Sequence, residues 1–200
     1  MKIRKITLFV LTVLVGFVAC KKDDDPSEVI VIELRDRAEQ QIADNDSIVK
    51  YLGEHYFNSS DIASNPDPNI DDLVITKLND GETVPDGSTL LSTVVETKQL
   101  VFADTDYDIY ILRLNQGGGA ESPHFSDNVR VRYEGFILNH SIFDSAVTPV
   151  DFDLTSLIPA WRKVLPEFNT AASFIDGGDG TVDYIDHGLG VMFVPSGLAY

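Results

Sequence analysis

The stretch that most constrains the fold is residues 129–146, VRVRYEGFILNHSIFDSA. Its first five residues, 129–133, alternate apolar and charged side chains with a period of two. This alternation is typical of a strand with one buried and one solvated face. Two more short extended segments, 136–138 and 141–143, are predicted on either side of a polar Asn-His turn, and a loop is predicted at 146–151. The pattern therefore predicts a sheet in which the chain turns a tight corner.

Phe143 and Asp144 stand next to each other just after this corner. Neighbouring side chains of an extended chain point to opposite faces. One of the two must therefore be held away from the direction that simple alternation gives it.

Short blocks of sequence follow one another in the second half of the chain: Tyr133-x-Gly135, Phe143-Asp144-Ser145, Pro149-x-x-Phe152-x-Leu154, 157–161 (LIPAW) and 194–200 (VPSGLAY). In this order the blocks resemble the signature of FKBP-type peptidyl-prolyl cis/trans isomerases. The resemblance extends over about residues 106–200. An ordered series of blocks is much more specific than any one of them alone.

The resemblance implies an α+β fold in which a twisted antiparallel sheet wraps around a short helix, preceded by an N-terminal helical segment. Pro159 supports the start of that short helix, because proline is well tolerated in a first helical turn. Members of the family continue past the position of Tyr200 with a flap loop and a final strand in the middle of the sheet. We therefore expect the chain to be C-terminally incomplete, since a sheet without that strand leaves backbone groups unpaired.

The resemblance also implies a proline-binding pocket with the single tryptophan as its floor. Its lining would be Tyr133, Phe143, Val150, Leu157, Ile158 and Trp161. Asp144 would lie at the rim facing the substrate carbonyl, and Tyr200 would donate a hydrogen bond to a carbonyl of the bound peptide. Without the neighbouring blocks, Trp161 would be interpreted as ordinary core packing. No cofactor and no metal are expected in such a site.

The function implied by the resemblance is peptidyl-prolyl cis/trans isomerisation in proline-containing, exported polypeptides. Two departures from the family keep an alternative open. The family often has phenylalanine at the position of Val150, and it follows the short helix with a turn much shorter than residues 174–188. Both differences alter the surroundings of the pocket. The alternative is a non-catalytic FKBP-like binding module or chaperone of a cell-envelope assembly.

The N-terminus is typical of an exported lipoprotein. A positively charged start is followed at 6–18 by an apolar run too short to span a bilayer comfortably. Residues 17–20, FVAC, resemble a bacterial lipobox, in which Cys20 becomes the lipidated first residue; the alternative is an unused thiol. We therefore predict a signal peptide at 1–19, an acidic tether at 20–28, and a lipid anchor that attaches the protein to the outer membrane on its periplasmic or cell-surface side.

Composition narrows the range of partners. Cys20 is the only cysteine, so the chain cannot form an intrachain disulfide or a thiolate metal site. The formal net charge is −17, and it becomes −20 once the three cations of residues 1–19 are removed. Such a surface repels phosphates and anionic headgroups, which argues against nucleic acid as a partner. The four histidines are scattered without ligand spacing, which argues against a zinc site.

Residues 29–104 are predicted to form a helix and short strands ahead of an isomerase-like region at 105–200. Apolar residues three and four apart predict a helix over about 33–57. Its expected buried stripe is Ala38, Ile42, Asn45, Val49, Leu52 and Tyr56. Asp44–Ser47 could instead cap a second helix, so one long helix or two short ones both fit. The stripe is expected to pack on the second half of the chain, and the alternative is a surface that forms a homodimer.

Residues 174–188, FIDGGDGTVDYIDHG, are rich in glycine and aspartate. The aspartates lack the spacing of an EF-hand, in which ligands alternate along a fixed loop that ends in glutamate. We therefore expect a solvated acidic loop rather than a calcium site.

Overall fold

The computed structural model describes residues 36–199. The predicted signal peptide (1–19), the tether (20–28), the anchor Cys20 and the site residue Tyr200 lie outside these residues. The predicted boundary between residues 104 and 105 falls in the turn of a hairpin formed by β4 (Glu96–Phe102) and β5 (Thr105–Asn115).

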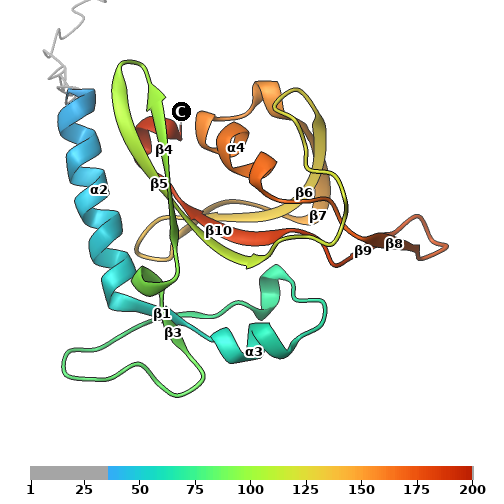
Figure 1. Cartoon of the computed structure of the whole chain (residues 1–200), viewed down its shortest axis with the longest axis horizontal. Helices are drawn as coiled ribbons and strands as arrows, with labels where there is room; N and C mark the ends of the chain where they lie inside the picture. Colours follow the sequence, from blue (N-terminus) through green and yellow to red (C-terminus); the bar gives the residue numbers. More distant parts are fainter. Residues whose placement is uncertain (1–35, 200) are drawn as a thin grey trace, which may run out of the picture. The chain divides into compact units, whose positions relative to one another are not determined.

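The described residues form a mixed α+β structure, as the sequence predicts (Figure 1). Its helices are α2 (Arg37–Glu54), α3 (Ser59–Ser64) and α4 (Pro159–Val164), with the one-turn 3-10 segments η1 (Ile70–Asp72), η2 (Leu91–Thr93), η3 (Leu154–Ser156), η4 (Leu165–Glu167) and η5 (Ser196–Leu198). The remaining strands are β1 (His55–Phe57), β2 (Ile75–Lys77), β3 (Thr89–Leu90), β6 (Asn128–Phe136), β7 (Ile142–Asp153), β8 (Ser173–Asp176), β9 (Val182–Ile185) and β10 (Leu189–Phe193). Within residues 36–199, no helix is both long enough and apolar enough to cross a membrane.

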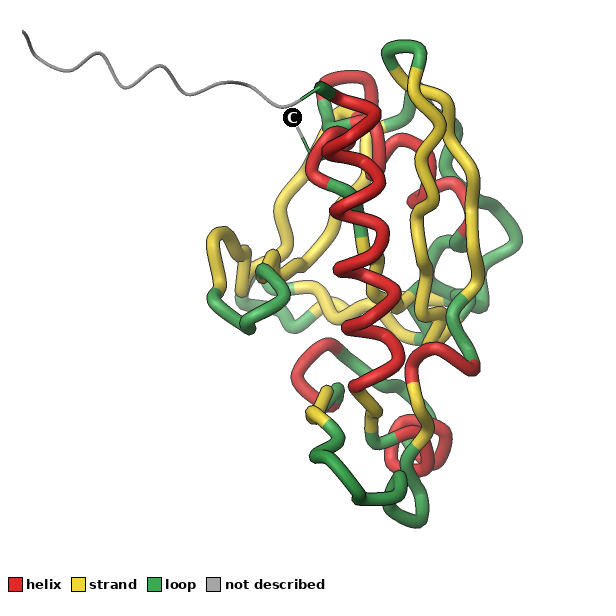
Figure 2. The backbone as a smooth tube through the Cα atoms, turned by 90° about the vertical axis from the view of Figure 1, so that its left-hand side faces the viewer, coloured by secondary structure: helices red, strands yellow, loops and turns green. Residues whose placement is uncertain are grey.

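The strands pair only in antiparallel fashion within the described residues. Their orders are β2-β1-β3, β10-β5-β4, β6-β7 and β8-β9. β5 is the central strand of the second sheet, and α2 runs alongside this sheet in both views of the backbone (Figures 1 and 2). Paired strands, rather than helices, therefore make most of the contacts between different elements of the fold.

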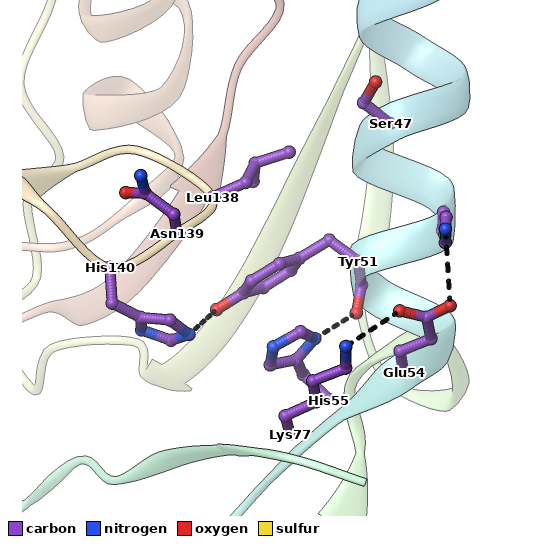
Figure 3. A pocket seen from close by; sticks show the side chains of 9 residues that line it. Ser47, Tyr51, Glu54, His55, Lys77, Leu138, Asn139 and His140 are labelled. Atoms are coloured by element: carbon purple, nitrogen blue, oxygen red, sulfur yellow. Dashed lines mark hydrogen bonds and ion pairs between the residues drawn. The ribbon is translucent and has the colours of Figure 1, made fainter. Parts of the chain in front are cut away.

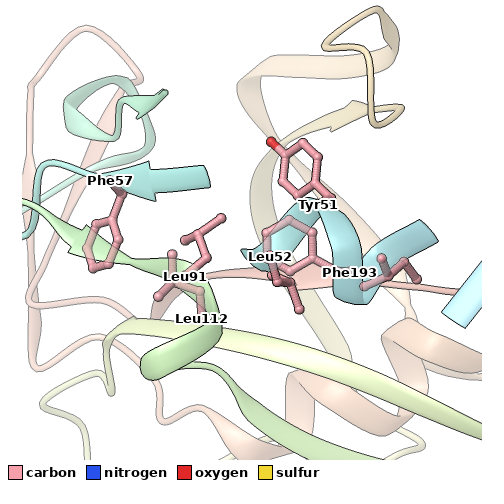
Figure 4. Close-up of a cluster of buried hydrophobic side chains, with 7 residues drawn as sticks. Tyr51, Leu52, Phe57, Leu91, Leu112 and Phe193 are labelled. Carbon is pink, nitrogen blue, oxygen red and sulfur yellow. The ribbon is translucent and has the colours of Figure 1, made fainter. Parts of the chain in front are cut away.

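β5 is buried on both faces because its side chains enter two separate cores. Tyr107, Ile109 and Ile111 are at most 2% exposed and pack against α4. Leu112 enters a second core with side chains from α2, β1, η2 and β10 (Figure 4). The other buried members of that core are Ile48, Tyr51, Leu52, Phe57, Leu91 and Phe193. A strand between two cores must be apolar on both faces, and the run 107–114, YDIYILRL, largely meets that need.

α2 is one continuous helix, and the predicted buried stripe is confirmed at Leu52 but wrong at Ala38, Ile42 and Val49. Ile42 and Val49 are 61% and 48% exposed. The buried side chains of the helix are Ile48, Tyr51 and Leu52. The helix also ends at Glu54 rather than near residue 57, because residues 55–57 form β1. The side of α2 that faces the rest of the fold also carries polar residues.

Asp44 and Asn45 are these polar residues, and they bind neighbouring elements instead of capping a second helix. The Asp44 carboxylate accepts hydrogen bonds from the backbone N–H of Ser196 at 2.7 Å and from its hydroxyl at 2.5 Å. Asn45 Oδ1 accepts a hydrogen bond of 2.9 Å from the Tyr110 hydroxyl on β5. The middle of α2 is therefore held to η5 and to the sheet through polar contacts.

Replacing Asp44 by alanine should lower the free energy of unfolding by about 1–3 kcal/mol, because the half-buried Ser196 loses the acceptor for two donors. Asp46→Ala is the matched control, since Asp46 is exposed on the same helix and should change stability by less than about 0.5 kcal/mol. Urea denaturation followed by circular dichroism measures both. Equal losses in the two variants would contradict the role of Asp44.

Residues 128–153 form one hairpin, β6–β7, rather than the three short segments and the loop that the sequence predicts. β6 continues through Phe136, and β7 runs through the expected loop at 146–151. Pro149 fits within β7 because the pairing is irregular between residues 131 and 133 of β6. A proline at such an irregularity does not interrupt a regular hydrogen-bond ladder.

Residues 174–188 contain a second hairpin, β8–β9, so the prediction of an irregular loop is wrong. The predicted exposure is confirmed for β8, all of whose residues are exposed. The Asp176 carboxylate accepts from the N–H of Gly178, and Asp179 accepts from that of Thr181, at 2.8 and 3.0 Å. These local bonds turn the chain, which allows the residues on both sides to pair as strands.

Candidate functional site

Three aromatic side chains pack against one another between the β6–β7 hairpin and α4. They are Tyr133 on β6, Phe152 on β7 and Trp161 on α4, and they are called the aromatic cup below. The ring centroids lie 5.2 Å apart for Tyr133 and Trp161, 5.7 Å for Phe152 and Trp161, and 5.9 Å for Tyr133 and Phe152. The indole meets the other two rings at 86° and 87°, the edge-to-face arrangement that aromatic quadrupoles favour. All three rings are only half-buried, so the cup is open to solvent.

Strand alternation places Tyr133 in the cup. Val129, Val131 and Tyr133 are the half-buried positions of this part of β6, and the charged residues between them are exposed. Across the hairpin, Phe152 pairs with Val129, and Val150 pairs with Val131. Directly paired residues of an antiparallel ladder point to the same face. The predicted wall residue Val150 therefore shares the face of the cup.

α4 positions Trp161. Pro159 occupies the first turn, with Ile158 as the N-cap, and the fixed φ of proline suits this place. Pro159 and Ala160 are buried, which anchors the start of the helix. The predicted lining residues Leu157 and Ile158 lie half-buried just before it, and Ile158 packs against the core of Tyr107, Ile109 and Ile111.

A β-bulge on β7 explains how Phe143 and Asp144 depart from simple alternation. Gly135 pairs with Asp144, whereas the next residue, Phe136, pairs with Ile142, so Phe143 is an extra residue. A bulge re-aims a side chain in this way. The Phe143 ring lies where a side chain on Gly135 would stand, because a Cβ there would come within 2.7 Å of the ring. Phe143 is nevertheless 71% exposed and lies at the edge of the site.

Asp144 lies at the lip of the cup. Its carboxylate accepts a hydrogen bond of 2.7 Å from the Tyr133 hydroxyl. This hydrogen bond is the main reason that the pKa of the Tyr133 phenol lies above its ordinary value, so the phenol keeps its proton and remains a donor. A half-buried aromatic surface with one oriented carboxylate beside it can contact a small apolar ring and the dipole of the attached amide.

Phe152 is a member of the cup that the predicted pocket omits. The predicted wall residue, Val150, lies two positions earlier on the same strand and the same face. The signal that could have identified Phe152 is the period of two between these residues, read together with the alternation of β6. Because residues 146–151 were expected to form a loop, the alternation of a strand was not applied to them. Val150 and Phe152 were therefore not assigned to the same face.

Substituting Phe152 by leucine should shift the emission maximum of Trp161, because the indole loses an edge-to-face partner and gains access to water. Trp161 is the only tryptophan, so the fluorescence reports on this site alone. Phe174→Leu is the matched control, since Phe174 is 68% exposed on β8. Identical spectra for wild type and Phe152→Leu would contradict the packing of the cup.

Comparison with known proteins gives partial matches to peptidyl-prolyl isomerases. Over 60 residues the chain is 37% identical to peptidyl-prolyl cis-trans isomerase Mip of Coxiella burnetii, covering 28% of this chain and 26% of that protein. It is 40% identical over 55 residues to the FKBP-type 22 kDa peptidyl-prolyl cis-trans isomerase of Escherichia coli, covering 26% of each. It is 29% identical over 91 residues to the probable FKBP-type peptidyl-prolyl cis-trans isomerase FkpA of Neisseria meningitidis, covering 44% of this chain and 28% of that protein. No family model and no solved structure matches.

The matched segments span between 26% and 28% of the length of these curated relatives. All three relatives are named as peptidyl-prolyl isomerases. Two of them are named as FKBP-type, and the mixed α+β structure of this chain is compatible with an FKBP-like fold.

Proposed function

We propose that this chain accelerates the cis/trans isomerisation of X-Pro bonds as an FKBP-type isomerase, by holding the proline ring in the aromatic cup. The observation that carries the proposal is the position of Tyr133, whose ring lies 5.2 Å from that of Trp161 and whose hydroxyl binds Asp144 at 2.7 Å. This combines apolar walls and one fixed carboxylate in a single half-open site. The partial similarity to three isomerases supports the same reaction.

The chemistry requires no group transfer. Rotation about an amide bond is opposed by a barrier of about 18–20 kcal/mol, because resonance is lost on the way. The twisted imide has a pyramidal nitrogen and less charge separation than either planar isomer. Apolar walls that remove water from the imide therefore favour the twisted form over the planar ones, which is differential binding of the transition state.

Each part of the site has a role in this proposal. Trp161 is the floor on which the proline ring rests, and the Tyr133 and Phe152 rings form walls beside it. Asp144 at the lip faces the imide carbonyl, and its hydrogen bond with Tyr133 fixes its direction. The remaining members would be Val150, Ile158 and Phe143 as apolar surface, with the Tyr200 hydroxyl as a donor to the peptide. The Leu157 N–H, expected to be a further donor, donates to the Leu154 carbonyl at 3.3 Å.

The cellular setting belongs to the same proposal. A signal peptide at 1–19 and lipidation of Cys20 would attach the protein to the outer membrane, on its periplasmic or cell-surface side, within reach of exported, proline-containing polypeptides. The FKBP-like arrangement would be a twisted sheet around α4. Ile42 and Val49, exposed on α2, support the alternative in which this helix forms a homodimer.

A second candidate function is a non-catalytic FKBP-like binding module or chaperone. Two observations favour it: the modest side chain of Val150 on the face of the cup, and the 71% exposure of Phe143. Both observations indicate a site that is open to solvent. Such a site suits binding of a polypeptide better than removal of water from an imide.

A protease-coupled assay of a proline tetrapeptide, with the full-length chain as catalyst, separates the two functions. The isomerase predicts a rate that rises in proportion to protein concentration. A rate no greater than that of buffer, together with a change in Trp161 fluorescence on adding the peptide, would favour the binding module.

A further inference from the structure

A depression of about 390 Å³ lies between the end of α2, β1 and the turn of the β6–β7 hairpin (Figure 3). It is separate from the aromatic cup, whose members do not line it. The residues that line it are Ser47, Lys50, Tyr51, Glu54, His55, Lys77, Leu138, Asn139 and His140. Two of the four histidines of the chain therefore face one cavity from elements that are far apart in the sequence.

His55 is held in a fixed orientation with one nitrogen free. It is 5% exposed, and its ring stacks on that of Tyr51 with centroids 3.7 Å apart. Its Nδ1 lies 2.8 Å from the backbone carbonyl oxygen of Tyr51. A carbonyl oxygen only accepts, so Nδ1 carries the proton and Nε2 keeps its lone pair. Metal-binding histidines commonly have this second hydrogen bond to a backbone carbonyl.

His140 approaches from the hairpin turn. Its φ is +66°, an uncommon conformation for a residue other than glycine, and its N–H donates to the carbonyl of Ile137 at 2.7 Å. Its ring centroid lies 5.6 Å from that of His55, and its Nε2 lies 3.4 Å from the Tyr51 hydroxyl. Figure 3 shows the Nε2 of His140 directed at the Tyr51 hydroxyl, with the imidazole of His55 close to both. The constrained turn thus brings a second imidazole ring close to the first.

We propose that His55 and His140 bind a divalent first-row transition metal ion of the Zn²⁺ or Cu²⁺ class. Imidazole nitrogen suits these ions, whereas Mg²⁺ and Ca²⁺ prefer oxygen ligands. Within residues 36–199, no group of three or more His, Cys, Asp or Glu side chains is placed to hold a metal, so water completes the coordination. The cations nearby, Lys50 and Lys77, each lie 3.9 Å from the carboxylate of Glu54, which offsets part of their charge.

The bound ion would tie α2 and β1 to the hairpin that carries Tyr133 and Asp144. Its effect on stability follows from binding only to the folded chain, because the two histidines meet only there. This site does not depend on the isomerase activity, since none of its residues belongs to the cup.

Isothermal titration of the chelator-treated full-length chain with ZnCl₂ tests the proposal. We expect one equivalent to bind, and His140→Ala to weaken binding at least tenfold. His124→Ala is the matched control, because His124 is an exposed histidine outside the depression, and it should bind as the wild type does. Excess MgCl₂ should not displace the zinc.

Thermal unfolding provides a second readout that does not depend on the buried His55. Zinc should raise the melting temperature of wild type and of His124→Ala, but not that of His140→Ala, a change at an exposed turn residue. Absence of zinc binding to the wild type, or equal binding and equal melting shifts in wild type and His140→Ala, would overturn the proposal.

Discussion

Replacing Asp144 by alanine should lower kcat/KM for a proline tetrapeptide at least about tenfold, which corresponds to roughly 1.4 kcal/mol of transition-state stabilisation. Asp144 is the only carboxylate that binds a member of the cup among the described hydrogen bonds, through the Tyr133 hydroxyl. Its removal would leave the lip uncharged and the phenol free to turn. The measurement is the protease-coupled rate at several enzyme concentrations.

Asp183→Ala is the matched control for this prediction. Asp183 is an exposed aspartate on β9, so the variant changes the net charge equally without touching the cup. Circular dichroism and Trp161 fluorescence establish that the Asp144 variant keeps its fold. A folded Asp144→Ala protein with the rate of the control would show that the carboxylate has no part in catalysis.

Leu112→Ala should lower the free energy of unfolding by about 2–5 kcal/mol. Leu112 is 1% exposed in the core that joins α2 to β5 and β10, so truncation removes buried methyl groups and leaves a cavity. Urea denaturation measures the change. Val101→Ala, at a position that is 68% exposed on β4, should change stability by less than about 0.5 kcal/mol. Similar losses in both variants would contradict the assignment of this core.

The sequence was most informative where a single local pattern is enough to determine an element of structure. The run 107–114 predicts a strand, and it forms the centre of a sheet between two cores. The α+β class follows from the mixture of such strands with a helical segment, and it is confirmed. Pro159 correctly indicates the start of α4, because a proline at that place has few alternatives.

Prediction from the sequence failed where the structure depends on polar contacts between distant residues or on hydrogen bonds within turns. Asp44, which the predicted stripe omits, binds Ser196 far along the chain, and the spacing of apolar residues does not reveal such a partner. The β8–β9 hairpin depends on short side-chain bonds at Asp176 and Asp179 that composition does not reveal.

The candidate site, too, was predicted in part and missed in part. The sequence places Tyr133 and Trp161 in one site, and the structure brings their rings into contact. The bulge that aims Phe143 and Asp144 depends on a register shift between two strands, and register cannot be read from either strand alone. The pairing of His55 with His140 likewise depends on how the hairpin turn meets α2, which no local spacing encodes.

Exchange NMR on a proline tetrapeptide at equilibrium tests the central claim most directly, because it observes cis/trans interconversion without a coupling protease. With a small amount of the full-length chain, we expect exchange peaks between the two isomers within about a second, and their loss with Trp161→Ala. Interconversion that stays on the uncatalysed scale of tens to hundreds of seconds with wild-type protein would contradict the isomerase assignment.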